Sequence, residues 1–293
     1  MSPAYVPPPD GRVCQHEGTE RLAINNTKLN RFLTLLALKT TAKLYTRNGP
    51  CKRISRHMIV KSDSWTHLTE AATMKFVSEN TSIPVPKVYC SFVWKNRAYI
   101  VMQRIQGRSI PSAWRDLSQE SRQELFNSLK AIIQELRSLK PSEGTGVESC
   151  IGGSLRDSRI PKSQPRFGPF ETINGFHLWL RNGLRPLERS TWGDEQEWEE
   201  IKAMAAKQDG PWPTSVFTHG DLNPSNIFVH GDRVAGIIDW EFSGWYPHYW
   251  EYTSAWLGNQ TTTEWQEDLC KFLDQYPAEL EMEKIRYRWW GGF

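Results

Sequence analysis

The chain has 293 residues, of which 24% are charged, and its net charge at pH 7 is +3. This near-balance gives no reason to expect a nucleic-acid partner, and the length suits a folded unit with a substantial core. The five cysteines are odd in number and scattered without a C-x-x-C pair, so neither a disulfide framework nor a zinc site is indicated, and we expect a reducing, cytoplasmic location.

The first 45 residues contain a proline-rich start and one apolar run. The proline-rich start predicts disorder; its prolines are Pro3, Pro7, Pro8 and Pro9. The one leader-like apolar run, Phe32 to Leu38, is short, lies far from the start and lacks a small-residue cleavage site. We therefore predict that it forms a buried helix. Because no apolar run is long enough to span a bilayer, no membrane partner is expected.

Strand and helix signals follow in residues 46–106. Met58 to Lys61 is a short apolar strand that ends in a lysine, and Glu70 lies in a following segment with helical periodicity. The helical face consists of Leu68, Ala71, Ala72 and Val77. Two more strands, Val88 to Trp94 and Ala98 to Arg104, are predicted on either side of a Lys95-Asn96-Arg97 turn.

Beyond Gly107 the spacing of apolar residues predicts helices. Ser118 is placed to cap a long helix that ends before Pro141. The apolar face of this helix consists of Leu125, Leu129, Ile132, Ile133, Leu136 and Leu139. The segment from Pro141 to Phe170 is rich in Gly, Ser, Pro and Arg and predicts a long loop, after which a helix restarts around Phe176 to Leu180.

The run from Val216 to Glu241, VFTHGDLNPSNIFVHGDRVAGIIDWE, carries the chemistry. A short strand delivers Asp221 to a loop, and Pro224 keeps the next residues out of regular structure. The apolar runs 227–229 and 234–238 predict a hairpin around a Gly-Asp turn. Folding that hairpin brings Asn226 and Asp239 close together at its open end, within about two residues of register.

These residue types suit phosphoryl transfer to a hydroxyl group. A carboxylate orients the hydroxyl and accepts its proton, and hard oxygen ligands hold the Mg²⁺ that offsets phosphate charge. Asp221 is the candidate for the first task, and Asn226 and Asp239 are candidates for the second. Glu241 is a weaker candidate for support of the metal site.

The same HGD tripeptide occurs a second time, at His230 to Asp232, where we do not expect it to be catalytic. It lies between strand-like runs, and no Asn follows Asp232 at the interval that separates Asp221 from Asn226. We therefore predict that it forms the turn of the hairpin. His219, in the first copy, is expected to brace the loop through hydrogen bonds rather than to perform acid-base chemistry.

The strings HGDLNPSN and IIDWE resemble the aminoglycoside phosphotransferase and choline kinase family, most closely its fungal members. The resemblance covers roughly Lys52 to Gly258. It implies an α+β, protein-kinase-like two-lobed fold, with a small N-lobe of antiparallel sheet plus one helix and a mainly helical C-lobe. The expected division is an N-terminal extension with a probable helix (1–45), an N-lobe (46–106) and a C-lobe (107–293).

The resemblance also implies further site residues. Lys61 would contact the α- and β-phosphates of ATP, and Glu70 would hold Lys61 in place. Backbone groups of the hinge would meet the adenine; the hinge residues are Met102, Gln103, Arg104 and Ile105. The cofactors implied are ATP and Mg²⁺, and the partner is a small-molecule hydroxyl acceptor.

Some questions stay open at this stage. The chain departs from the family pattern before Lys61, where Tyr45 to Ser55 offers Gly49 but no glycine-rich phosphate loop. The rings between Trp240 and Trp256 either cage a cationic acceptor or fill the core, and we favour the core. The acidic runs Asp194 to Glu200 and Glu264 to Asp268 either attract an amine or form exposed helix faces.

The sequence therefore predicts an ATP- and Mg²⁺-dependent small-molecule kinase. A catalytically inactive binding module is the alternative, although Lys61, Glu70, Asp221, Asn226 and Asp239 are all present. A protein kinase is disfavoured because no Ala-Pro-Glu tripeptide follows Asp239. The acceptor, whether sugar, amino alcohol, aminoglycoside or specialised metabolite, and the oligomeric state are not predicted.

Overall fold

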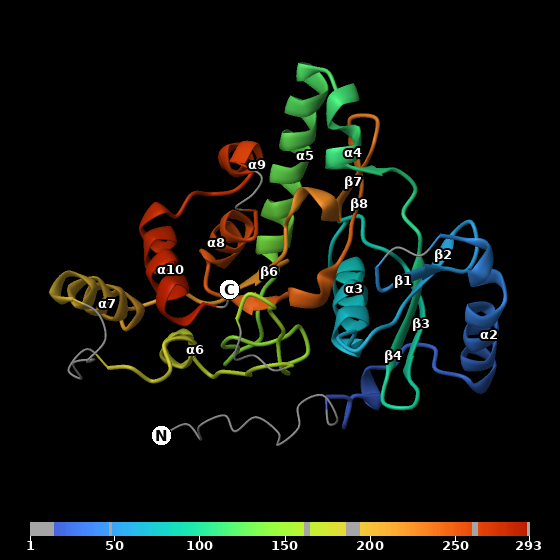
Figure 1. Ribbon diagram of the computed structural model, residues 1–293, viewed down its shortest axis with the longest axis horizontal. Helices are drawn as coiled ribbons and strands as arrows, with labels where there is room; N and C mark the ends of the chain where they lie inside the picture. The colour runs from blue at the N-terminus through green and yellow to red at the C-terminus, as the bar shows by residue number, and fades with distance from the viewer. Residues whose placement is uncertain (1–14, 47–48, 161–164, 186–193, 260–262, 292–293) are drawn as a thin grey trace.

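A four-stranded antiparallel sheet forms the smaller lobe of the protein (Figure 1). The computed structural model describes residues 15–46, 49–160, 165–185, 194–259 and 263–291. The strand order in this sheet is β1-β2-β4-β3, with bounds β1 Cys51–Arg53, β2 Met58–Lys61, β3 Val88–Val93 and β4 Ala98–Gln103. The predicted hairpin is confirmed, and Lys95 and Asn96 form its turn with φ values of 50° and 52°. The predicted strand that ends in Lys61 is also confirmed.

Two helices cover the two faces of this sheet; one was expected within the N-lobe and the other within the N-terminal extension. α3 (Leu68–Asn80), the helix that carries Glu70, packs on the face toward the larger lobe, and α2 (Lys28–Lys39) packs on the outer face (Figure 1). The alternation of β4 shows why both faces are apolar: Ile100 and Met102 join the core with α3, whereas Val101 points to the cluster beneath α2.

The prediction of a buried helix over Phe32 to Leu38 is right about the helix and wrong about its burial. Thr34 is the buried residue of α2, and Phe32 is 61% exposed. The helix contacts the sheet through Thr34, Ala37 and Leu38, whereas Leu29, Phe32, Leu33 and Leu36 are exposed. The proline-rich start lies outside the described residues.

The larger lobe contains the long helix α5, capped by Ser118 as predicted, whose side chain accepts from the Ser121 amide at 3.1 Å. Its other helices are mostly short, and its strands form one three-stranded and one two-stranded sheet. The helices are α4 Ile110–Ala113, α5 Gln119–Ser138, α6 Ile173–Leu180, α7 Glu195–Gln208, α8 Trp250–Leu257, α9 Thr263–Asp268 and α10 Pro277–Trp290. The strands are β5 Arg108–Ser109, β6 Val216–Thr218, β7 Ile227–His230, β8 Arg233–Ile237 and β9 Gly244–Tyr246.

The predicted loop between α5 and α6 is held at several points against the larger lobe. Backbone bridges join Val147 to Phe170 and Leu155 to Phe167, and another pairs Glu148 with Trp245 of β9. Val147, Leu155 and Phe167 are buried in an apolar cluster that they share with α6, α7, α8 and α10, so the loop is packed into the core of the larger lobe. This anchoring fixes the charged residues that the loop presents to the neighbouring site.

Most of the aromatic residues that follow Asp239 fill the core, as favoured from the sequence; Trp256 is only partly buried, and the Lys284 ammonium lies 4.5 Å from its ring centre. Their side chains are buried at Trp240, Trp245, Tyr246, Tyr249, Trp250 and Tyr252, and Tyr246 stacks on Trp250 at 5.3 Å. They cannot form an open cage for a cation in this structure. The two acidic runs lie at the start of α7 and in α9, where most of their carboxylates are exposed.

Candidate active site

The loop after β6 presents Asp221 at the junction of the two lobes. Gly220 makes the necessary turn with φ of 82°, and a Cβ there would lie 2.7 Å from the Phe242 carbonyl oxygen. Only glycine satisfies both conditions. Residues 221–223 have no regular structure, as predicted, but Pro224 then begins a single 3₁₀ turn, η4 (Pro224–Asn226), rather than excluding regular structure altogether.

Asp221 and Asn226 are joined directly. The Asn226 side-chain amide donates to the Asp221 backbone oxygen and to its Oδ2, both at 2.9 Å. Asn226 is itself buried. Because its nitrogen faces Asp221, its Oδ1 is the atom that would be left for a metal ion.

The hairpin β7–β8 carries Asp239 to the same place. Ile227 pairs with Ile237, and the Ile238 amide donates to the Asn226 carbonyl oxygen at 2.9 Å, so the predicted register holds. Asp239 then has φ of 66°, a left-handed conformation that costs a non-glycine residue about 1–3 kcal/mol. Such strain is typical of functional sites. It turns the Asp239 carboxylate toward the smaller lobe.

The Lys61 ammonium lies among three carboxylates. Its Nζ is 3.0 Å from Glu70 Oε1, 2.5 Å from Asp239 Oδ1 and 3.3 Å from Glu241 Oε2. The predicted pair of Lys61 and Glu70 is therefore present, and Glu241, the weaker candidate, joins it through η5 (Trp240–Phe242). One lysine thus links β2, α3 and the segment after β8.

This cluster holds more carboxylates than cationic side chains. Burial alone would lower the pKa of Lys61, but the surrounding carboxylates hold it well above its usual value. Burial raises the pKa of Glu70 to about 8 despite the adjacent ammonium. Arg156 pairs with Glu241 from the other side. Lys61 and Arg156 can balance two of the three carboxylates, and a bound cation would favour the ionised form of the third.

The donor set suits a divalent cation that prefers oxygen ligands. Ligand atoms of Glu70, Asp239 and Glu241 lie within 4.8 Å of one another. The Glu70 Oε2 atom is buried without a hydrogen-bond partner among the described residues. The carboxylate of Asp239 is partly exposed, so it is accessible from solvent. Carboxylate and amide oxygens are the ligands that Mg²⁺ prefers.

Buried groups behind the site brace the loop that carries Asp221. The Glu251 carboxylate, from the first turn of α8, accepts from the His219 amide at 2.6 Å and from the Gly220 amide at 3.0 Å. The His219 ring bonds the Ile238 carbonyl oxygen at 3.1 Å and its Nδ1 accepts from the Asp221 amide at 3.2 Å. Burial lowers the pKa of His219, so the ring is neutral. These bonds confirm the bracing role predicted for His219.

Sequence reasoning missed Arg156, Arg159 and Glu251. The two arginines come from the long loop, where their signal was only an arginine-rich composition. Arg159 pairs with Asp157, donates to the Gly220 carbonyl oxygen, and donates to the Ser254 carbonyl oxygen at 2.9 Å. Its charge opposes the rise that burial imposes on the pKa of Asp221.

The backbone amides of the hinge residues differ in whether they are already hydrogen-bonded. Met102 and Gln103 end β4, the Gln103 amide donates to Lys87, and the Arg104 amide donates to His57. Among the described residues, no hydrogen bond engages the Ile105 amide. Of the residues predicted to meet an adenine, Ile105 is the one with an available donor.

The model of the phosphotransferase enzyme family matches residues 66–285, three quarters of the chain. The chain belongs to this family. The match contains Glu70, the catalytic loop and Asp239, but begins just after Lys61.

Curated relatives of the family match shorter stretches. An aminoglycoside 3'-phosphotransferase of Enterococcus faecalis is 26% identical over 110 residues, which are 37% of this chain and 42% of that protein. A homoserine kinase of Sinorhizobium fredii is 35% identical over 86 residues, or 25% of this chain and 26% of that protein. The chain thus aligns with less than half the length of these relatives.

Solved structures of the family share the fold. A thermostable mutant of aminoglycoside phosphotransferase APH(4)-Ia, in a complex with AMP-PNP and hygromycin B, matches with a TM-score of 0.53 at 12% identity, over 83% of this chain and 82% of that one. APH(3'')-Id from Streptomyces rimosus, in complex with ADP and streptomycin, matches with a TM-score of 0.50 at 16% identity, over 90% and 98%. The protein-kinase-like two-lobed fold implied by the resemblance is confirmed.

Glu251 provides a test of the bracing that does not depend on activity. We expect Glu251→Ala to lower the free energy of unfolding by about 3 kcal/mol, because it leaves two buried amides without an acceptor. Urea denaturation followed by circular dichroism measures this change. Glu267→Ala, at an exposed position of α9, is the control and should change stability little. Equal stability of the two variants would contradict the bracing.

Proposed function

We propose that this protein transfers the γ-phosphoryl group of ATP, with Mg²⁺, to a hydroxyl group of a small molecule. The observation that carries the proposal is the junction of the two lobes. There the bonded pair of Asp221 and Asn226 is tied by the Ile238 amide to Asp239, whose carboxylate holds Lys61. Proton acceptor, metal ligands and phosphate-binding cation thus lie at one place.

Each residue has a separate task in this proposal. Asp221 orients the acceptor hydroxyl and takes its proton as the new oxygen–phosphorus bond forms and the bond to the ADP leaving group breaks. Asn226 Oδ1 and Asp239 hold Mg²⁺, which offsets phosphate charge when bound. Lys61, positioned by Glu70, contacts the phosphates. The available Ile105 amide meets the adenine at the hinge of Met102, Gln103, Arg104 and Ile105.

Catalysis in this proposal is positioning and electrostatics, without a covalent enzyme intermediate. Asp221 must therefore be ionised, although burial raises its pKa. Arg159 counteracts this effect and at the same time anchors the carbonyl oxygen of Gly220, next to Asp221 in the chain. Arg159 is a positioning residue in this scheme, because it acts through the loop and through Asp221.

A binding module without catalysis is the alternative, and ligand binding separates the two. The proposed enzyme should be stabilised in a thermal-shift assay by ATP more strongly with Mg²⁺ than without, because binding to the folded state raises its stability. A fold indifferent to both would favour the alternative. The relatives named for aminoglycosides and homoserine support a hydroxylated small molecule as acceptor. Screening hydroxylated metabolites for ADP release identifies it.

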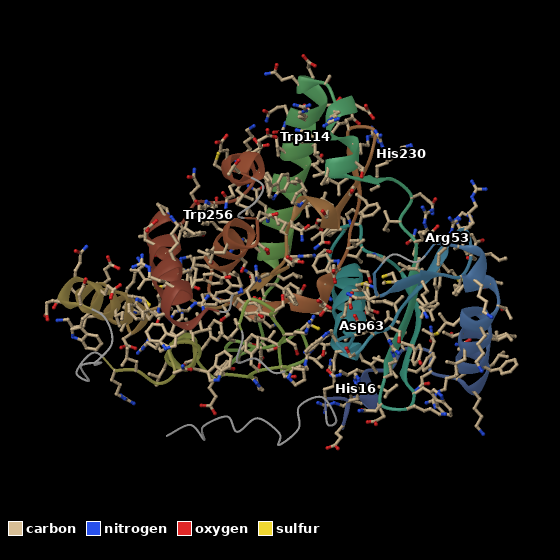
Figure 2. All side chains as sticks on the ribbon, in the orientation of Figure 1. His16, Arg53, Asp63, Trp114, His230 and Trp256 are labelled. Carbon is tan, nitrogen blue, oxygen red and sulfur yellow. The ribbon has the colours of Figure 1, made fainter. Side chains whose placement is uncertain are left out.

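The two HGD aspartates give the first test of mechanism. Asp221→Asn should leave the protein folded and able to bind ATP but lower turnover by roughly 10²–10⁴, the usual effect of a positioned base. Asp232→Ala should leave turnover per folded molecule nearly unchanged, because Asp232 lies in the exposed hairpin turn beside His230, at the outer end of the hairpin (Figure 2). ADP release, normalised to folded protein, measures both. If Asp232→Ala were the inactive variant, the assignment of the catalytic loop would be wrong.

Asp239 gives the second test. Asp239→Ala removes an anionic oxygen that Mg²⁺ needs, so it should weaken Mg²⁺-dependent nucleotide binding as well as turnover. Titration of Mg²⁺ at fixed ATP, followed by the thermal shift, measures this effect, and Glu241→Gln is the comparison. An unchanged Mg²⁺ dependence in Asp239→Ala together with a weakened one in Glu241→Gln would transfer the ligand role to Glu241.

Arg159 predicts a pH dependence. Removing its charge in Arg159→Met should raise the pKa of Asp221 further, since a neighbouring cation favours the ionised carboxylate. Turnover requires that carboxylate, so the acid limb of the pH–turnover profile should move to higher pH by about one unit or more. Arg108→Met, which removes an exposed pair with Asp116, is the control. Equal loss of turnover at every pH would show that Arg159 acts only on structure.

A further inference from the structure

The outer face of α2 carries a concentration of exposed apolar side chains. Seven large apolar residues among those the structure describes are exposed, and five of them lie in α2 and the 3₁₀ turn η2 (Thr41–Leu44) that follows it. Their exposed fractions are 64% for Leu29, 61% for Phe32, 49% for Leu33, 44% for Leu36 and 80% for Leu44. Single exposed apolar residues are common, but a contiguous group indicates a binding surface.

The helix geometry makes these residues one stripe. Leu29, Phe32, Leu33 and Leu36 follow the i, i+3, i+4, i+7 spacing of a single helix face. The opposite side of α2 contacts the sheet through Thr34, Ala37 and Leu38. An amphipathic helix normally turns its large apolar residues to the core. This helix turns them outward, so core packing does not account for them. We call these four residues the α2 stripe.

The segment around the α2 stripe is basic. No Asp or Glu occurs between Glu20 and Asp63, whereas ten Lys and Arg residues do. They are Arg21, Lys28, Arg31, Lys39, Lys43, Arg47, Lys52, Arg53, Arg56 and Lys61. Lys61 is buried at the junction of the lobes and does not belong to this surface. Lys28 and Lys39 lie at the two ends of α2 and are exposed. Within the part of the chain that the structure describes, neither of them forms an ion pair with a carboxylate.

A small basic cavity adjoins the end of α2. It has a volume of about 130 Å³ and is lined by Leu38, Ala42, Lys43, Tyr45, Thr46, Lys52 and Arg53. The Arg53 guanidinium stacks over Tyr45, with its carbon 4.3 Å from the ring centre. Arg53 lies on the same outer side of the lobe as α2 (Figure 2). Three cations with hydroxyl and aromatic groups around one hollow suit a phosphate-bearing headgroup.

We propose that the α2 stripe and this cavity form a peripheral binding surface for an anionic lipid bilayer. An interfacial helix buries its apolar side chains at the headgroup boundary while flanking lysines and arginines attract anionic lipids. Both parts are present here without an intervening acidic residue. The expectation of no membrane partner rested only on the absence of a spanning segment, which a peripheral contact does not need. None of the described helices is long and apolar enough to cross a bilayer.

The positive charge around the α2 stripe favours an anionic bilayer, rather than a second copy of the chain, as its partner. A two-fold dimer through the α2 stripe would place the same basic segment on both sides of the interface, and like charges would face each other. An anionic membrane has the opposite charge. The placement is also compatible with the proposed function, because α2 covers the sheet face opposite α3 and the junction of the lobes (Figure 1). A bilayer on the α2 side would not cover Asp221. The membrane proposal does not rest on that function.

Vesicle flotation of the full chain tests the proposal. The protein should float with vesicles of phosphatidylcholine and phosphatidylserine, bind vesicles of phosphatidylcholine alone much less, and be released from the anionic vesicles by high salt. Phe32→Ser with Leu36→Ser, and separately Lys39→Glu with Lys43→Glu, should each lower partitioning to anionic vesicles by about tenfold or more.

Matched controls separate the surface from general charge and hydrophobicity. Lys130→Glu with Lys140→Glu changes the same charge at exposed positions of the larger lobe, and Ile151→Ser removes an exposed apolar side chain there. Both controls should bind vesicles much as the unaltered chain does. All substituted positions are exposed, so each variant should keep its fold, which thermal unfolding checks.

Two results would overturn the proposal. One is equal flotation of the unaltered chain with both kinds of vesicle, or equal binding by the α2 variants and the controls. The other is a dimer in sedimentation velocity that Phe32→Ser with Leu36→Ser abolishes, without vesicle binding by the unaltered chain. That result would assign the α2 stripe to contact between copies of the chain.

Discussion

The buried ammonium of Lys61 connects the two lobes, and the geometry of the candidate site depends on it. It contacts Glu70 within its own lobe and reaches Asp239 and Glu241, which lie 178 and 180 residues further along the chain. Removing these charges from water is costly, and a buried ion cluster is weak evidence for stability. Its three carboxylates against two cationic side chains, together with the orphaned Glu70 oxygen, instead point to a role in holding a cation and phosphates.

The other half of the site is held by Glu251, His219 and Arg159, which bond the backbone around Asp221. Glu251 holds two consecutive amides, His219 fills the space between the loop and Ile238, and Arg159 draws the Gly220 carbonyl oxygen from the opposite side. Asp221 is therefore fixed from three directions before any substrate binds. Preorganisation of this kind is what phosphoryl transfer requires of a protein. The long loop supplies its arginines because its buried apolar residues anchor it.

The two regions with proposed functions lie on opposite sides of the smaller lobe. On the inner face, α3 presents Glu70 to the junction of the lobes, and on the outer face, α2 presents its apolar stripe to solvent. The sheet between them is buried on both faces, so each helix can perform a separate task. A membrane contact through α2 would localise the protein without altering the chemistry at Asp221.

Local patterns in the sequence determined the strands around Lys61 and Lys95, the capped helix after Ser118, and the hairpin that brings Asn226 and Asp239 together. They did so because periodicity, turn residues and caps act over a few positions. Only the tertiary structure decided that α2 exposes Leu29, Phe32, Leu33 and Leu36. The spacing of apolar residues predicts that a helix has an apolar face, but it does not predict whether another part of the protein packs against that face. The tertiary structure also decided that Arg159 is the arginine of the long loop that reaches Gly220, and that Glu251 binds the amides of His219 and Gly220. Contacts between residues far apart in the chain leave no periodic signal, so the sequence could not reveal them.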